Sequence, residues 1–105
     1  MSDYNDYSED SSFQKMMGRS KEWCLIGEQI ANDCLVNGLR KGERVNLSEI
    51  TAFIISNYTY NTKAVESGFL TRMKVFIEND EILNFAGEDG ETVFIHKNYI
   101  NEQLS

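Results

Sequence analysis

The sequence lacks any long hydrophobic run. Its longest uninterrupted apolar stretches, such as Ala52 to Ile55 and Val75 to Ile77, are only a few residues long, whereas a membrane-spanning helix needs about 20 apolar residues. The first residues are acidic and polar, where a secretory signal would be basic and then apolar. We therefore expect no transmembrane helix, no membrane partner and a cytoplasmic location.

Cysteine and histidine are also scarce, with two cysteines and one histidine in 105 residues. Cys24 and Cys34 fall in one predicted helix, where ten residues at about 1.5 Å rise separate them by about 15 Å, too far for a disulfide. We expect two free thiols. His96 has no second histidine or cysteine pair at metal-ligand spacing, so we interpret it as a surface or strand-end residue.

Sequence motifs of catalysis and cofactor binding are missing too. There is no Gly-x-Ser-x-Gly nucleophile motif and no glycine-rich phosphate loop. Glu88, Asp89 and Glu91 stand among glycines, but they lack the spacing of a calcium-binding loop. The sequence therefore predicts a protein that is not an enzyme and has no cofactor and no metal site.

Charge is unevenly distributed along the chain, which has 10 Lys and Arg against 17 Asp and Glu and a net charge of -7. Residues 1–14 carry four acids and no base, residues 15–77 nine bases and six acids, and residues 78–105 one base and seven acids. The first segment predicts a disordered acidic N-terminal arm. The remainder, 15–105, fits a single domain whose middle is mildly basic.

Hydrophobic spacing predicts a long first helix. Apolar residues recur at helical steps from Phe13 to Leu35, and Ser20 is a candidate cap for its packed part. Asn37-Gly38 is expected to end the helix with the glycine in a left-handed conformation. Two interpretations stay open for the start of this helix: it extends into the core, or it offers an exposed strip for a homodimer through Phe13, Met16 and Met17.

A second helix is predicted after a short extended segment at Val45. Asn46 and Glu49 have the spacing in which each side chain bonds the other's free backbone amide, so they mark its start. It is expected to end at the polar cluster 57–61. Its expected apolar face consists of Leu47, Ile50, Phe53 and Ile54.

A third helix and a β-hairpin complete the pattern. Asn61 or Thr62 is expected to cap this helix, and residues 79–80 to end it. Ile82 to Phe85 and Thr92 to Ile95 are two β-prone runs joined by a turn-rich connector. The predicted fold class is therefore mainly α with a small antiparallel β-hairpin. The expected buried stripe of the third helix consists of Val65, Phe69, Leu70, Met73, Phe76 and Ile77.

The order helix, short strand, helix, tight turn, helix and hairpin resembles the winged helix-turn-helix domain over about residues 20–95. The closest stretch is VNLSEITAFIISNYTYNTKAVESGFLTRMKVFIENDEILNFAGEDGETVFIHKNY. Within it, FLTRMKVFIENDEI resembles the end of a recognition helix and its passage into the first wing strand. The resemblance lies in element order and apolar positions, and it implies three helices plus a wing.

This resemblance implies a DNA-binding protein with a role in transcription regulation, because the third helix of the family enters the major groove. Polar side chains at its start can bond base edges, and basic side chains can bond phosphates. The candidate base-contacting residues are Asn61, Thr62, Lys63, Glu66, Ser67 and Thr71. The candidate phosphate-contacting residues are Arg40, Lys41, Arg44, Arg72 and Lys74.

The hairpin loop departs from the DNA-binding pattern of the family, since it offers Glu88, Asp89 and Glu91 where a basic residue is usual. Negative charge beside a duplex opposes binding to its phosphates. The alternative is an adaptor or inhibitor that uses its acidic wing and arm to bind a basic protein surface, such as that of a polymerase, a nuclease or another nucleic-acid-binding factor. Under the DNA-binding hypothesis, the arm instead competes with DNA for the basic face.

Overall fold

The computed structural model describes residues 11–100, with side chains described from Lys21 onward. Within that range the fold is mainly α with a small antiparallel sheet, as predicted. The helices are α1 (Ser11–Asn37), α2 (Leu47–Asn57) and α3 (Thr62–Glu78), the strands are β2 (Val45–Asn46), β3 (Ile82–Ala86) and β4 (Thr92–His96), and the 3₁₀ turns are η1 (Leu39–Lys41) and η2 (Lys97–Tyr99).

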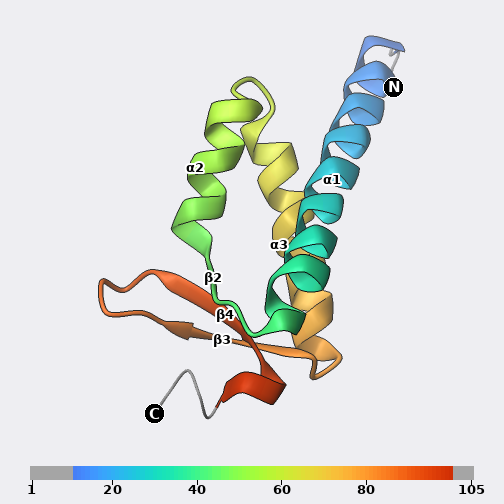
Figure 1. The fold of residues 1–105 in the computed structure, drawn as a ribbon. Helices are drawn as coiled ribbons and strands as arrows, with labels where there is room; N and C mark the ends of the chain where they lie inside the picture. Colours follow the sequence, from blue (N-terminus) through green and yellow to red (C-terminus); the bar gives the residue numbers. More distant parts are fainter. Residues whose placement is uncertain (1–10, 101–105) are drawn as a thin grey trace.

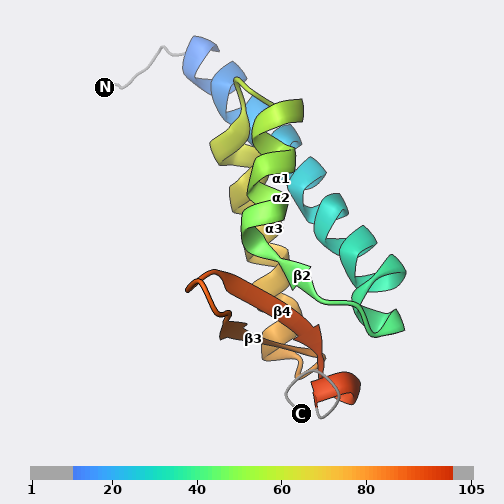
Figure 2. The same ribbon diagram turned by 60° about the vertical axis from the view of Figure 1, so that its left-hand side comes forward.

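The three strands form one antiparallel sheet in the order β2-β4-β3. Val45 of β2 pairs with Phe94 of β4, and Leu83 of β3 pairs with Ile95 on the other side of β4. The sheet lies across one end of the helices, and the loop between α2 and α3 lies at the opposite end (Figures 1 and 2). The loop between β3 and β4 points away from α1 (Figure 1). The sheet thus joins β2, which precedes α2, to the β3–β4 hairpin, which follows α3.

Helices α1 and α3 pack with their backbones in close contact. Gly27 of α1 lies against the carbonyl of Val65, and Gly68 of α3 lies against the carbonyl of Cys24. A Cβ atom on either glycine would overlap the facing carbonyl oxygen. The two glycines therefore set the distance between these helices, because a close-packed interface has no room for an added methyl group.

The core lies where the three helices meet the inner face of the sheet. Ile54 of α2, Phe69 of α3 and Ile82 of β3 have no exposed surface. The Phe69 ring packs edge-on against Phe94 of β4, with 6.4 Å between the ring centroids. All three α-helices and the sheet thus contribute to one hydrophobic cluster. This cluster holds the exposed side of α3 in a fixed position.

Two residues on the predicted apolar faces are more exposed than their helical spacing indicates, and the prediction that Leu70 is buried is wrong. Phe53 of α2 keeps 49% of its surface exposed and Leu70 of α3 keeps 39%. Helix α2 buries Ile54 instead, and α3 buries Phe69 and Met73. In so small a domain each helix meets its neighbours along a narrow stripe, so an apolar residue at the edge of that stripe stays in contact with water.

The helix ends agree in part with the sequence signals. Asn46 caps α2 as predicted, but its Oδ1 accepts the hydrogen bond from the backbone N–H of Ser48, at 2.9 Å, and not from that of Glu49. Helix α1 ends at Asn37, but Gly38 has a φ of -129°, so the prediction of a left-handed glycine there is wrong. The chain continues into η1, and the left-handed glycine is Gly42 after that turn, with a φ of 92°.

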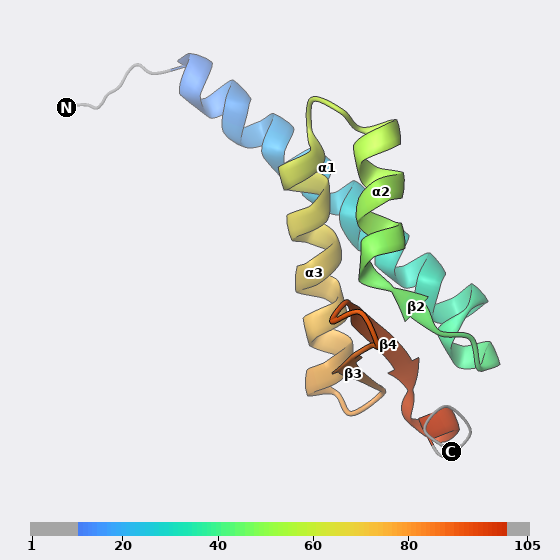
Figure 3. The ribbon, with the colours of Figure 1, turned by 90° about the vertical axis from the view of Figure 1, so that its left-hand side faces the viewer.

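Helix α1 is continuous over 27 residues, so Ser20 lies inside it and the prediction that Ser20 caps it is wrong. The helix begins before residue 15, where the sequence places the domain boundary, and residues 1–10 of the predicted arm lie outside the described residues. Its first turns extend past the loop between α2 and α3 (Figures 1 and 3). Despite this length, no helix within the described part of the chain has the apolar character that a membrane crossing requires.

The homodimer predicted through the start of α1 stays a prediction. It depends on the side chains of Phe13, Met16 and Met17, which lie outside the described side chains. The prediction that Cys24 and Cys34 of α1 are free thiols is confirmed.

Candidate functional site

Helix α3 presents a polar, mildly basic side to solvent, which we call the α3 face. It consists of the exposed residues Lys63, Ser67, Leu70, Thr71 and Lys74. The opposite side of the helix is buried against α1 and the sheet. Before Glu78, the last residue of α3, the exposed charged residues of this helix are Lys63 and Lys74. The α3 face is therefore positive on a protein whose net charge is -7.

Two of the predicted base-contacting residues, Thr62 and Glu66, make side-chain hydrogen bonds within the fold. Asn61 is the N-cap residue of α3 and is half-buried. The hydroxyl of Thr62 donates to the carbonyl of Tyr58 at 2.9 Å. The carboxylate of Glu66 accepts a hydrogen bond from the Thr51 hydroxyl at 3.2 Å, which joins α3 to α2. Lys63, Ser67 and Thr71 remain as the predicted base-contacting residues that lie on the α3 face.

Arg40, a predicted phosphate contact, is exposed but is held in an ion pair with Glu81. Its Nε lies 2.6 Å from one oxygen of Glu81 and its Nη2 lies 3.2 Å from the other, a two-pronged ion pair. Hydrogen bonding to Arg40 is the main cause that holds the pKa of Glu81 below its ordinary value. The pair ties η1, at the end of α1, to the start of the hairpin.

Arg72 is engaged as well, whereas Lys41 and Arg44 remain exposed. The Arg72 Nε donates to the side-chain oxygen of Asn32 on α1 at 3.1 Å, and its guanidinium lies 5.3 Å from the centre of the Phe76 ring. Arg44 covers the Phe85 ring at 5.4 Å and keeps contact with solvent. Of the five predicted phosphate contacts, the exposed ones without an ion pair among the described residues are Lys41, Arg44 and Lys74.

The loop between β3 and β4 forms a tight acidic tip. Glu91 turns back over the loop, and its carboxylate accepts a hydrogen bond from the Asp89 N–H at 3.1 Å. The N–H of Gly87 donates to the Glu91 carbonyl at 2.7 Å, and Gly90 takes the left-handed conformation with a φ of 82°. Glu88 and Asp89 are exposed. The tip therefore presents two carboxylates to solvent, while the third stabilises the turn.

His96 lies at the end of β4, as predicted, but it is buried, with 7% of its surface exposed. Its Nδ1 accepts a hydrogen bond from the Asn98 N–H at 3.2 Å, and its Nε2 lies 3.3 Å from Glu81. Both ring nitrogens are thus used within the fold. Among the described side chains, no three His, Cys, Asp or Glu residues gather in a way that could hold a metal ion.

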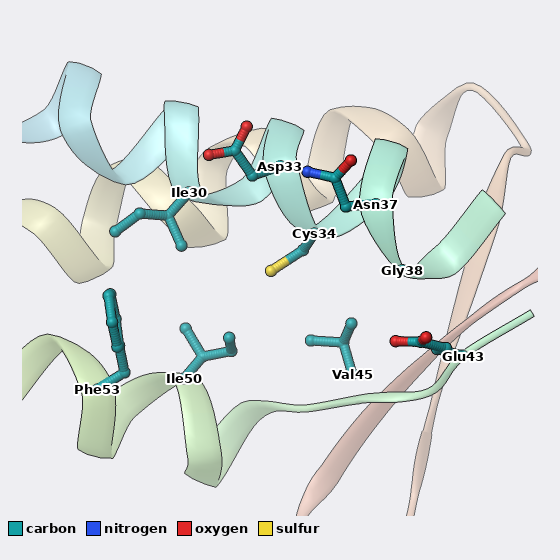
Figure 4. Close-up of a pocket in the computed structure, with 9 residues that line it drawn as sticks. All are labelled: Ile30, Asp33, Cys34, Asn37, Gly38, Glu43, Val45, Ile50 and Phe53. Carbon is teal, nitrogen blue, oxygen red and sulfur yellow. The ribbon is translucent and has the colours of Figure 1, made fainter. Parts of the chain in front are cut away.

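An apolar groove lies between α1 and α2, and no sequence pattern predicts it. It has a volume of about 420 Å³. Ile30 and Cys34 point into it from α1, opposite Ile50 and Phe53 of α2 (Figure 4). Its remaining lining residues are Asp33, Asn37, Gly38, Glu43 and Val45. The half-exposed Phe53 belongs to this groove, and three segments of the chain, 30–38, 43–45 and 50–53, meet there, so no local motif marks it.

No protein-family model, no curated protein and no solved structure matches this chain. The functional assignment therefore depends on the geometry and charge of the α3 face, the acidic tip and the groove.

Proposed function

We propose that this chain is a winged helix-turn-helix protein that binds duplex DNA through the α3 face. The element order and the strand order β2-β4-β3 support a winged helix, with β3 and β4 as the wing. The observation that carries the DNA proposal is the positive α3 face, with Lys63 and Lys74 at its two ends and hydroxyl groups between them. A helix with such a face fits the major groove, where hydroxyls can bond any base edge.

In this proposal the roles are narrower than the sequence implied. Lys63, Ser67 and Thr71 contact base edges, and Lys74 with Lys41 and Arg44 contacts phosphates. Asn61 is half-buried at the N-cap of α3. Four other residues contact DNA only if they leave the partners described above: Thr62, Glu66, Arg40 and Arg72. Because few phosphates are neutralised, we expect weak binding that falls steeply with salt.

The test is a fluorescence anisotropy titration of random and AT-rich duplexes at low salt. We expect Lys63→Gln and Lys74→Gln each to weaken binding, and Lys74→Gln, which loses a phosphate contact, to lower the salt slope by about 0.9. Lys97→Gln is the matched control, because Lys97 is an exposed lysine on η2, away from the α3 face. Absence of binding at about 100 µM protein, the weak end of ordinary non-specific affinity, would contradict the proposal, and so would equal losses in all three variants.

The acidic tip supports a second candidate, an adaptor that binds a basic protein surface. Glu88 and Asp89 are exposed and, within residues 21–100, neither carboxylate has a cationic partner. Carboxylates on a protruding loop can steer a protein toward a positive cleft.

One variant separates the two functions. Reversing the tip charge with Glu88→Lys and Asp89→Lys should strengthen DNA binding, because it removes repulsion from the duplex. The same change should abolish capture of a basic partner in a pull-down, whereas Glu49→Lys on α2 should leave that capture unchanged. Tip variants that bind DNA no better and lose a specific partner would favour the adaptor.

A further inference from the structure

The groove between α1 and α2 is limited at both ends. Trp23 of α1 and Tyr58, the residue that follows α2, make an edge-on ring contact with centroids 5.9 Å apart, which joins the two helices beyond Ile30 and Phe53. At the other end the chain crosses from α1 through η1 to β2, and Glu43 lies beside Gly38 (Figure 4). Along α1 the wall from Ile30 to Gly38 is about 12 Å long at about 1.5 Å rise per residue.

The groove combines apolar walls with acidic groups at one end and on its rim. Ile30, Ile50 and Phe53 form apolar parts of its walls (Figure 4). Asp33 and Glu43 are exposed, and neither carboxylate makes a hydrogen bond or ion pair within the described part of the chain. A carboxylate next to apolar surface and without a partner favours a cation that can also cover that surface.

Cys34 adds to the apolar wall rather than to the negative charge. Burial, with a smaller effect from Asp33, raises the pKa of its thiol above the ordinary value of 9.0. The thiol is therefore protonated at neutral pH and acts as a small hydrophobic group. The negative charge of the groove at neutral pH thus resides in the two carboxylates alone.

From this arrangement we infer that the groove binds a small amphiphilic organic cation. The ammonium or guanidinium group of the ligand lies at Glu43, and its apolar body lies between Ile30 and Phe53. The volume of about 420 Å³ falls within the range of small-molecule sites. The closed ends favour a compact ligand over a helix of a partner protein, which would have to run through them. This inference does not depend on DNA binding.

The first experiment is an NMR titration of the full-length, ¹⁵N-labelled protein with 4-phenylbutylammonium. For a ligand of this size we expect roughly millimolar affinity and shifts of the backbone amides of residues 30–38 and 43–53. The wing residues 83–95 serve as the internal reference. The isosteric anion 4-phenylbutanoate should bind at least about threefold more weakly, since its charge opposes Glu43. Equal binding of both probes, or shifts centred outside the groove, would overturn the inference.

The second experiment changes the groove itself. Glu43→Gln should weaken binding of the ammonium probe by about threefold and leave binding of the neutral 4-phenylbutan-1-ol unchanged. Phe53→Ala should weaken both, because it removes part of the apolar wall. Glu88→Gln on the wing is the matched control and should change neither. Unaltered amide spectra outside the groove verify that the variants fold, and an ammonium affinity that Glu43→Gln does not alter counts against the site.

Discussion

The two sides of α1 show how differently one helix can be packed. Toward α3 it is in backbone contact at Gly27 and Gly68, with no space for a single added methyl group. Toward α2 it leaves a groove of about 420 Å³, lined by half-exposed apolar residues. The first side fixes the position of the α3 face, and the second leaves space for a ligand. Stability and binding are thus assigned to adjacent sides of the same helix.

The largest effect should come from filling the close interface. In Gly68→Ala the new Cβ would overlap the Cys24 carbonyl of α1, so the helices must separate. We expect a loss of about 3 kcal/mol in the free energy of unfolding, measured by urea denaturation. Ser67→Ala, on the exposed side of the same turn, should change it by less than about 0.5 kcal/mol. A Gly68→Ala variant as stable as Ser67→Ala would show that the interface is not close-packed.

The next effect compares neighbours on α2, where Ile54 has no exposed surface and Phe53 is 49% exposed in the groove. Ile54→Ala should cost about 2–3 kcal/mol through the cavity that it leaves. Phe53→Ala removes a larger side chain but should cost only about 1 kcal/mol, because much of the ring already contacts water. The same denaturation assay measures both. The reverse order would mean that the groove is closed in solution.

A smaller effect depends on pH and on the ion pair at the end of α1. Because Arg40 lowers the pKa of Glu81 in the folded state, the pair stabilises the fold above the ordinary carboxyl value of 4.5, and this stabilisation is lost as the pH falls through the folded value. Wild type should therefore exceed Glu81→Gln in stability at pH 7, and the difference should shrink steadily below pH 4.5. A difference independent of pH would exclude the ion pair as its cause. Glu88→Gln should show no such dependence.

The smallest effect tests the electrostatics of the groove. Asp33 is the lesser of the two causes that raise the pKa of Cys34, so Asp33→Asn should lower that pKa without restoring its ordinary value. At pH 8 we expect alkylation of Cys34 to accelerate by about twofold, because more of the thiol is ionised. Peptide mass spectrometry follows both cysteines, and Cys24 reports any general loosening of α1. An equal acceleration at Cys24 would assign the effect to structure rather than to charge.

Much of the fold could be predicted because its signals are local. Asn46 caps α2 through a neighbouring amide, and the apolar period of α3 correctly identifies Phe69 and Met73 as buried. The candidate site was harder to predict from the sequence. Arg40 is 41 residues from Glu81 in sequence, and Arg72 is 40 from Asn32, so nothing local indicates that these two cations have partners. Lys63 and Lys74 could be placed on the α3 face from helical spacing alone.

The sequence by itself determined the order and type of the elements, since hydrophobic period, caps and turn residues act over a few neighbouring positions. Only the tertiary structure decided which side of α1 is closed and which is open. Gly27 and Gly68 appear in the sequence as helix-weakening residues, and their role exists only when two distant helices meet. Likewise, the groove comes into being where α1, η1, β2 and α2 converge, so its apolar walls and its carboxylates are brought together by folding.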